Sequence, residues 1–234
     1  MVKRVSIHSA NLYYALKWVL TNINSFRIEL ESKGYYSIQI YKIFLWKNNA
    51  KYFKVFNIKG ECFFVKLQPN DKVLHESRVI KHIESQSLGR FSFHSKIYSS
   101  VIGKYSYNIF EEFVGSKISR KIILKNDLIS QMLDILLFFN KIKIVHRDIR
   151  PHNIIIVDNC IKIIDFEHCS IDNEKMNNNS EELNSVFSPS GHKWDDAYSF
   201  KRILDYYIEL ANLKDNPDYI KLLDMVNKNI YEYN

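Results

Sequence analysis

The chain has 234 residues, of which 46% are apolar and 14% aromatic, enough to bury one core or two small ones. Charged residues make up 25% and mean hydropathy is −0.25, which excludes a wholly disordered chain and a protein with many membrane spans. With only 6 glycines and 4 prolines, a fibrous architecture is excluded as well. The net charge of +7 favours anionic partners such as nucleotide phosphates, nucleic acid, anionic lipid or acidic glycans.

The cysteines and the N-terminal stretch bear on the compartment. Cys62, Cys160 and Cys169 form no CxxC pair and are odd in number, which favours a reducing intracellular environment. The sequence starts without the apolar core and cleavage site of a signal peptide, and its most apolar stretch, 12–20, is too short to span a bilayer. We therefore expect a cytoplasmic protein, with a peripheral position at the inner membrane face left open. The sequence contains no run of five or six basic residues, so it does not indicate a nucleic-acid partner.

Apolar periodicity predicts a strand-rich N-terminal half. In chain order we expect a helix over 8–32, then three strands over 35–46, 50–58 and 61–67. A second helix over 71–85 and two further strands over 95–101 and 105–113 should follow. In the second helix, the inward positions are predicted to be Val73, Val79, Ile80 and Ile83.

After a short connector near 114–118, the pattern becomes helical. We expect a buried helix over 126–141, a tight hairpin over 153–166 and a polar stretch over 170–192. Two final helices are expected over 195–213 and 218–231. The sequence therefore predicts the α+β class, with strands first and helices later.

The segment His146-Arg147-Asp148-Ile149-Arg150-Pro151-His152-Asn153 places a carboxylate and an amide on a loop before the hairpin. Asp165 follows at the far end of that hairpin, which should return it close to Asn153 and Asp148. Asp148 would then be placed to orient a hydroxyl, while the amide and the second carboxylate hold a hard cation such as Mg²⁺. Phosphoryl transfer needs this set, because its catalysis is mostly positioning and charge neutralisation.

HRD-x-x-x-x-N followed by a hairpin and Asp-Phe resembles the catalytic-loop and metal-loop signature of the protein kinase-like superfamily. The resemblance covers roughly residues 36–210. It implies a two-lobed α+β fold, with an antiparallel-sheet nucleotide-binding lobe over 1–114, which includes the N-terminal helix. A helical catalytic lobe with reduced C-terminal helices would occupy 115–234. The alternative is a chance HRD in a loop before an unrelated strand.

The resemblance implies ATP and Mg²⁺ as cofactors and a role for each residue of the loop. Asp148 would act as the catalytic base, and Arg150, where many relatives have lysine, would stabilise charge on the transferring phosphate. Asn153 would serve catalysis and, with Asp165, hold the metal ion.

In the N-terminal half, the resemblance assigns nucleotide binding to four residues. Lys66 would contact the α- and β-phosphates, and Glu76 would pair with it. A lysine within an apolar strand is costly unless paired, although Glu84 competes as the partner and an edge-strand lysine facing water is the other interpretation. Backbone groups of Glu112 and Val114 would hold the adenine, unless this segment is only a strand end with a turn.

Several features depart from the protein kinases. The first turn, 46–51, carries lysines in place of a glycine-rich loop, and Glu167 replaces the glycine after Asp-Phe, as in choline kinase-like and antibiotic phosphotransferase relatives. Before Asp196, only Ser188-Pro189-Ser190 faintly matches the Ala-Pro-Glu element. Asp196 is expected to cap the backbone of the catalytic loop, or else to be a helix N-cap. Few residues follow it, too few for the helices on which protein kinases dock polypeptides.

These departures make the chain similar to compact bacterial kinases of the lipopolysaccharide-core and Kdo kinase group. The expected function is ATP-dependent transfer of the γ-phosphate to a hydroxyl of a sugar or glycolipid, in lipopolysaccharide biosynthesis. A basic chain suits an acidic, membrane-associated acceptor and a peripheral contact with an anionic membrane surface. The alternatives are a protein serine/threonine kinase, such as a minimal bacterial effector or toxin, and a nucleotide-binding pseudokinase.

Overall fold

The computed structural model describes residues 2–47, 49–87, 93–125, 127–172, 174, 186–187, 193–226 and 231–232. Within these residues the chain is mixed α+β, with six α-helices and a five-stranded antiparallel sheet, as the sequence predicts. It divides into two compact units. Unit 1 comprises Met1–Ser77 and Lys96–Glu112, and unit 2 comprises Arg78–Ser95 and Phe113–Asn234.

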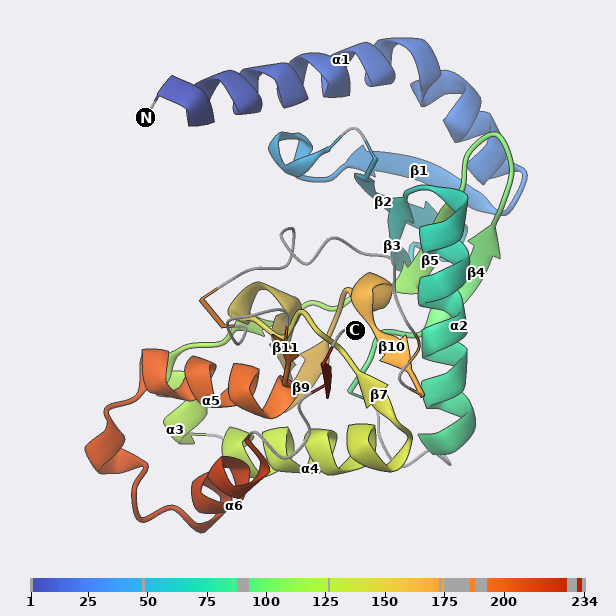
Figure 1. Ribbon diagram of the computed structural model, residues 1–234. Helices are drawn as coiled ribbons and strands as arrows, with labels where there is room; N and C mark the ends of the chain where they lie inside the picture. The colour runs from blue at the N-terminus through green and yellow to red at the C-terminus, as the bar shows by residue number, and fades with distance from the viewer. Residues whose placement is uncertain are drawn as a thin grey trace. The chain divides into compact units, whose positions relative to one another are not determined.

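Unit 1 is built on the five-stranded sheet, whose strand order is β1-β2-β3-β5-β4 (Figure 1). The strands are β1 (Tyr35–Ile40), β2 (Lys51–Asn57), β3 (Cys62–Leu67), β4 (Ile97–Val101) and β5 (Tyr107–Glu111). The first strand ends at Ile40, although the alternating pattern predicts that it continues to residue 46. Lys42 adopts a left-handed conformation that ends the extended backbone, and the short 3-10 helix η1 (Ile43–Leu45) follows.

The long helix α1 (Val2–Glu31) covers one face of this sheet (Figure 1). Phe26 and Leu30 are fully buried there, and the ring of Phe26 packs against Phe53 of β2 and Tyr107 of β5, with ring centroids 5.1 and 5.3 Å apart. By contrast, Leu12, Leu16 and Leu20, which form part of the apolar pattern that predicts the helix, are exposed, Leu20 by 85%. Among the residues of α1 whose burial is described, the side chains that enter the core of unit 1 come mainly from its C-terminal half, together with Ala15.

The helix α2 (Asn70–Ser87) begins in unit 1 and ends in unit 2. The prediction of its inward positions is confirmed, because Val73, Val79, Ile80 and Ile83 are all fully buried or nearly so. Burying four apolar side chains of this size stabilises the fold by about 1.5–3 kcal/mol each.

Unit 2 contains the remaining helices and several short sheets. The helices are α3 (Arg120–Lys125), α4 (Leu128–Lys141), α5 (Asp196–Tyr207) and α6 (Pro217–Met225), and the 3-10 helices are η2 (Pro151–Asn153), η3 (Phe166–His168) and η5 (Leu210–Asn212). One sheet has the order β6-β8-β9, and the pairs β7 with β10 and β11 with β12 are separate. These strands are β6 (Ser116–Lys117), β7 (Ile144–Val145), β8 (Ile154–Val157), β9 (Cys160–Ile163), β10 (Ser170–Ile171), β11 (Lys193–Trp194) and β12 (Tyr231–Glu232).

Of two helices predicted in unit 2, one is present over nearly all of its expected range and the other ends early. The buried helix expected over 126–141 is present as α4, with eight buried apolar side chains. The helix expected over 195–213 ends earlier, at Tyr207, because Ile208 is extended and the chain then forms η5. Every helix within the described residues is too short or too polar to cross a membrane.

Candidate active site

The loop from His146 to Asn153 joins β7 to β8, and Asp196 fixes its start. The backbone N–H of His146 donates to Oδ2 of Asp196 at 2.6 Å, and that of Arg147 donates to Oδ1 at 3.0 Å. Arg147 itself has a left-handed backbone, with φ 71°. Burial raises the pKa of Asp196 to about 7, against these hydrogen bonds, which lower it.

The N-cap of α5 is the neighbouring aspartate. Asp195 accepts a hydrogen bond from the backbone N–H of Tyr198 at 3.0 Å, as an N-cap does. The sequence left two interpretations of Asp196, as a cap of the loop backbone or as a helix N-cap. The structure supports the first.

Asp148 and Asn153 lie together in the interior of unit 2. The side-chain nitrogen Nδ2 of Asn153 donates to the backbone oxygen of Asp148 at 2.9 Å and to its Oδ2 at 2.8 Å. Arg150 Nη2 lies 3.0 Å from the same Oδ2. Because both N–H bonds of the Asn153 amide are directed at Asp148, its oxygen Oδ1 is the atom left for another ligand.

The carboxyl group of Asp148 has one held oxygen and one open oxygen. Oδ2 receives Asn153 and Arg150, whereas Oδ1 is buried and has no hydrogen-bond partner among the described residues. Burial raises the pKa of Asp148 to about 6, and the positive charge of Arg150 opposes this shift. An unsatisfied buried acceptor carries a desolvation cost of about 1–3 kcal/mol, which a donating hydroxyl at this oxygen would relieve.

The hairpin β8–β9 returns the chain to this loop, as its length predicts. Ile154 is paired with Ile163, and the backbone N–H of Ile164 donates to the backbone oxygen of Asn153 at 3.0 Å. Asp165 comes next, in a left-handed conformation with φ 70°, and its negative charge contributes to raising the pKa of Asp148. The structure thus brings together Asp148, Arg150, Asn153 and Asp165, the four residues that the sequence predicts for this half of the site.

The oxygen donors of this group suit a hard cation. Oδ1 of Asn153 is available because of the direction of its amide, and Asp165 supplies a half-buried carboxylate. Mg²⁺ uses one or two such groups and completes its shell with water and phosphate oxygens, so these residues fit the ion. Within the described residues, no group of three or more His, Cys, Asp or Glu side chains has the spacing of a metal site.

His146 and Arg147 hold the loop against the segment after Asp165, contacts that the sequence reasoning did not assign. The ring of His146 lies 4.8 Å from that of Phe166, and its Nδ1 accepts from the backbone N–H of Asp148 at 3.3 Å. Burial lowers the pKa of His146 to about 4, so the imidazole is neutral near pH 7. Arg147 donates to the backbone oxygen of His168 at 3.4 Å. Their position within the HRD motif was the available signal.

Glu167, which replaces the glycine after Asp-Phe, is paired with its neighbour. Its Oε1 lies 3.1 Å from Nε2 of His168. The position of the Glu167 side chain is thus explained by its contact with His168, and no metal ion is needed to explain it.

In unit 1, Lys66 on β3 pairs with Glu76 on α2, as predicted. Nζ of Lys66 lies 3.4 and 3.3 Å from the two carboxylate oxygens, and both side chains are buried. Glu84, the competing partner, is exposed. Gln68, which the sequence reasoning missed, donates to Oε2 of Glu76 at 3.0 Å, so the carboxylate is held from two sides. A polar residue two positions after the lysine was the only signal for it.

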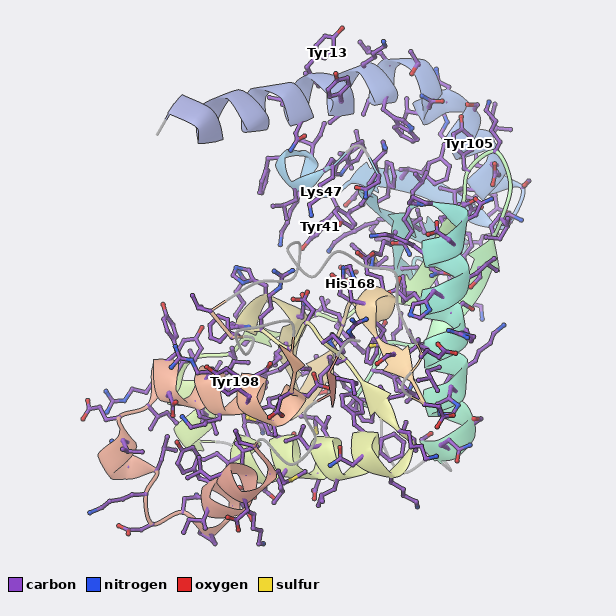
Figure 2. The ribbon with its side chains drawn as sticks, in the orientation of Figure 1. Tyr13, Tyr41, Lys47, Tyr105, His168 and Tyr198 are labelled. Carbon is purple, nitrogen blue, oxygen red and sulfur yellow. The ribbon has the colours of Figure 1, made fainter. Side chains whose placement is uncertain are left out.

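The sheet face that carries Lys66 also carries aromatic rings. Side chains alternate between the faces of a strand, so Phe64 shares this face with Lys66. The ring of Phe64 lies 5.8 Å from Tyr41, 6.0 Å from Tyr52 and 6.4 Å from Phe110, and the Tyr52 contact is stacked. Figure 2 labels Tyr41 beside η1.

Glu112 and Val114 fall in different units. The carboxylate of Glu112 forms an ion pair with Lys54 on β2, and the side chain of Val114 is exposed. The assignment of their backbone groups to adenine stays a prediction. Ser188-Pro189-Ser190 and most of the polar stretch 170–192 lie outside the described residues.

Comparison with protein-family models and with curated proteins finds no match to this chain.

Proposed function

We propose that this chain is an ATP-dependent phosphotransferase of the protein kinase-like type, which moves the γ-phosphate to a hydroxyl of a sugar or glycolipid. The observation that carries the proposal is the arrangement of the loop 146–153. A buried carboxylate is held at one oxygen by Asn153 and Arg150 and is open at the other. That arrangement suits a group that receives the proton of an acceptor hydroxyl.

In the proposed mechanism, the residues of unit 2 act on the transferring group. Asp148 orients the acceptor hydroxyl and takes up its proton at Oδ1. The guanidinium of Arg150, which is partly exposed beyond its contact with Asp148, stabilises charge on the phosphate oxygens. Asn153 and Asp165 would hold Mg²⁺, which supplies neutralisation of the phosphate charge when it is bound.

The residues of unit 1 bind the nucleotide in this proposal. Lys66, positioned by Glu76 and Gln68, contacts the α- and β-phosphates. The rings of Phe64, Tyr41 and Tyr52 on the same sheet face offer planar surfaces for a base. The backbone of Glu112 and Val114 contributes the hydrogen bonds to the adenine edge.

A glycolipid of the lipopolysaccharide-core kind is the acceptor class we favour. The net charge of +7 suits an acidic acceptor. The exposed Leu12, Leu16 and Leu20 on α1, with the exposed Tyr13 labelled in Figure 2, suit a peripheral contact with an anionic membrane surface, where such an acceptor resides. This contact would place the protein at the inner face of the membrane.

The test is phosphate transfer from ATP in the presence of Mg²⁺ to a panel of sugars, lipopolysaccharide core and casein. We expect transfer to a sugar or to the core oligosaccharide and none to casein. Transfer to casein or to the chain itself would assign the protein to the protein kinases instead. Tight ATP binding without transfer to any acceptor would support a pseudokinase and contradict the proposal.

A further inference from the structure

Unit 1 also contains a hollow of about 420 Å³. None of the residues to which a catalytic role is assigned above lines it. Its walls come from α1, the start of β2, the end of β3, the first residue of α2 and the loop between β4 and β5. Figure 2 labels Tyr105 on that loop, whose hydroxyl donates to Oδ1 of Asn22 on α1 at 3.2 Å. This volume is within the range of small-molecule sites.

The hollow lies on the sheet face opposite to Lys66. Lys51 lines it and belongs to the same face of β2 as Phe53 and Val55, which are buried in the core under α1. Lys66 is paired with the neighbouring Tyr52, whose side chain points to the other face. A ligand in the hollow would therefore be separate from the phosphates proposed at Lys66.

The lining is positively charged. Lys51 and Lys104 both contribute to it, and none of the described residues that line it is acidic. Lys51 is only 7% exposed, and its Nζ lies 5.5 Å from the ring centroid of Trp18, which also lines the hollow. Burial lowers the pKa of Lys51, in keeping with an ammonium group in a site short of water. An anion in the hollow would be attracted by the two ammonium groups that line it.

The polar groups around the lysines match a phosphate ester that carries hydroxyls. Asn49 lines the hollow and carries an amide that can donate and accept. Asn22 and Ser106 also line it, and their oxygens can each accept one more hydrogen bond beside those from Tyr105 and the backbone N–H of Gly103. Pro69 and Asn70 line it at the N-terminus of the 18-residue α2, whose first N–H groups add to the positive potential. Two ammonium groups together with this helix end favour a dianion over a carboxylate.

We propose that this hollow is a binding site for a small phosphorylated polyol, such as a sugar phosphate, distinct from the nucleotide site. Gln68 connects the two faces, because it lines the hollow and also donates to Glu76, the partner of Lys66. A bound ligand thus restrains Gln68 and, through it, the carboxylate that positions Lys66. The proposal concerns binding alone and does not depend on the proposed phosphotransfer.

The test is calorimetric titration of the full chain with glucose 6-phosphate, glucose and inorganic phosphate. We expect glucose 6-phosphate to bind and glucose not to bind, and inorganic phosphate to bind more weakly than the ester. Lys51→Met and Lys104→Met should each weaken binding of the ester about tenfold or more, since each removes a charge contact. Lys59→Met is the matched control, because Lys59 is exposed at the β2–β3 turn and does not line the hollow.

A further readout locates the ligand. The indole N–H resonance of Trp18, assigned with Trp18→Phe, should shift on titration with the ester, because Trp18 lines the hollow. Absence of binding by both phosphate compounds would overturn the proposal. So would binding that persists in Lys51→Met and Lys104→Met, or binding that leaves the resonance of Trp18 in place.

Discussion

Charged side chains in the interior of each unit are held in fixed directions by their neighbours. Asp148 has Oδ2 bound by Asn153 and Arg150 and Oδ1 open, and Glu76 is bound by Lys66 and Gln68. A buried charge is tolerated only when such partners compensate its desolvation. The residues that the sequence marks as chemical are therefore also residues on which folding depends.

The Lys66–Glu76 pair allows this dependence to be measured. Glu76→Leu leaves the buried ammonium of Lys66 without this carboxylate and should lower the free energy of unfolding by about 3–5 kcal/mol. The double variant Lys66→Met/Glu76→Leu should recover most of the loss, because a buried ion pair and an apolar pair are often similar in stability. Urea denaturation measures both.

The exposed pair Arg27–Glu31 is the control, and Arg27→Met should change the free energy of unfolding by less than about 1 kcal/mol. A double variant as unstable as Glu76→Leu alone would contradict this account.

His146 predicts a pH dependence of stability. Its pKa is about 4 in the folded chain and 6.5 in the unfolded chain, so between these values the unfolded chain binds more protons. Its contribution is complete above pH 6.5 and is lost as the pH falls toward 4, by up to about 3 kcal/mol. His146→Phe lacks this proton uptake, so the stability difference between wild type and variant should shift in favour of the variant on acidification. A difference that is constant from pH 7 to pH 4, measured by urea denaturation, would be inconsistent with a buried neutral imidazole.

Gly115 is required by the close approach of two strands. A Cβ at this position would lie 2.4 Å from the backbone oxygen of Ile156 on β8, next to the pairing of β6 with β8. Gly115→Ala should therefore destabilise the protein by about 1–3 kcal/mol. Gly103→Ala, where a Cβ meets no atom within 4 Å, should be close to neutral. Thermal denaturation compares the two, and equal melting temperatures would refute the packing argument.

At the scale of elements, periodicity predicted buried faces well only where apolar and polar residues separate cleanly. The four inward positions of α2 are confirmed, since polar residues occupy the rest of that helix apart from the exposed Leu74. On α1, apolar residues are spread over several sides, so the pattern predicted a helix without showing that Phe26 and Leu30 are buried while Leu20 is exposed. The end of β1 at Ile40 depends on the left-handed Lys42, which alternation cannot reveal.

The exposed leucines of α1 give a prediction for membrane contact. Leu16→Ser/Leu20→Ser should reduce cosedimentation with anionic phospholipid vesicles, because the apolar side chains enter the interface and the basic protein supplies the attraction. Ile58→Ser is the control, since Ile58 is equally exposed at the β2–β3 turn of the same unit. Equal binding of wild type and the double variant, or equal loss in the control, would refute a role for α1.

At the scale of the whole molecule, motif spacing predicted which residues of the site come together within each unit. Asp148, Asn153 and Asp165 were found from the loop and hairpin lengths, and Glu76 from its place on the helix after Lys66. Gln68, the contact of Arg147 with His168, and the hollow beside Lys51 could not be found this way. They depend on which strand ends and loops pack together, and no local pattern encodes that.

The central claim is that the open oxygen of Asp148 serves phosphotransfer, and turnover by Asp148→Asn tests it most directly. ATP consumption with Mg²⁺ and the acceptor found from the panel should fall at least about hundredfold, as expected when a positioned base is removed. ATP binding should be retained, and the exposed Asp134→Asn on α4 should keep wild-type turnover. Turnover by Asp148→Asn equal to that of wild type would contradict the assignment of this loop as the active site.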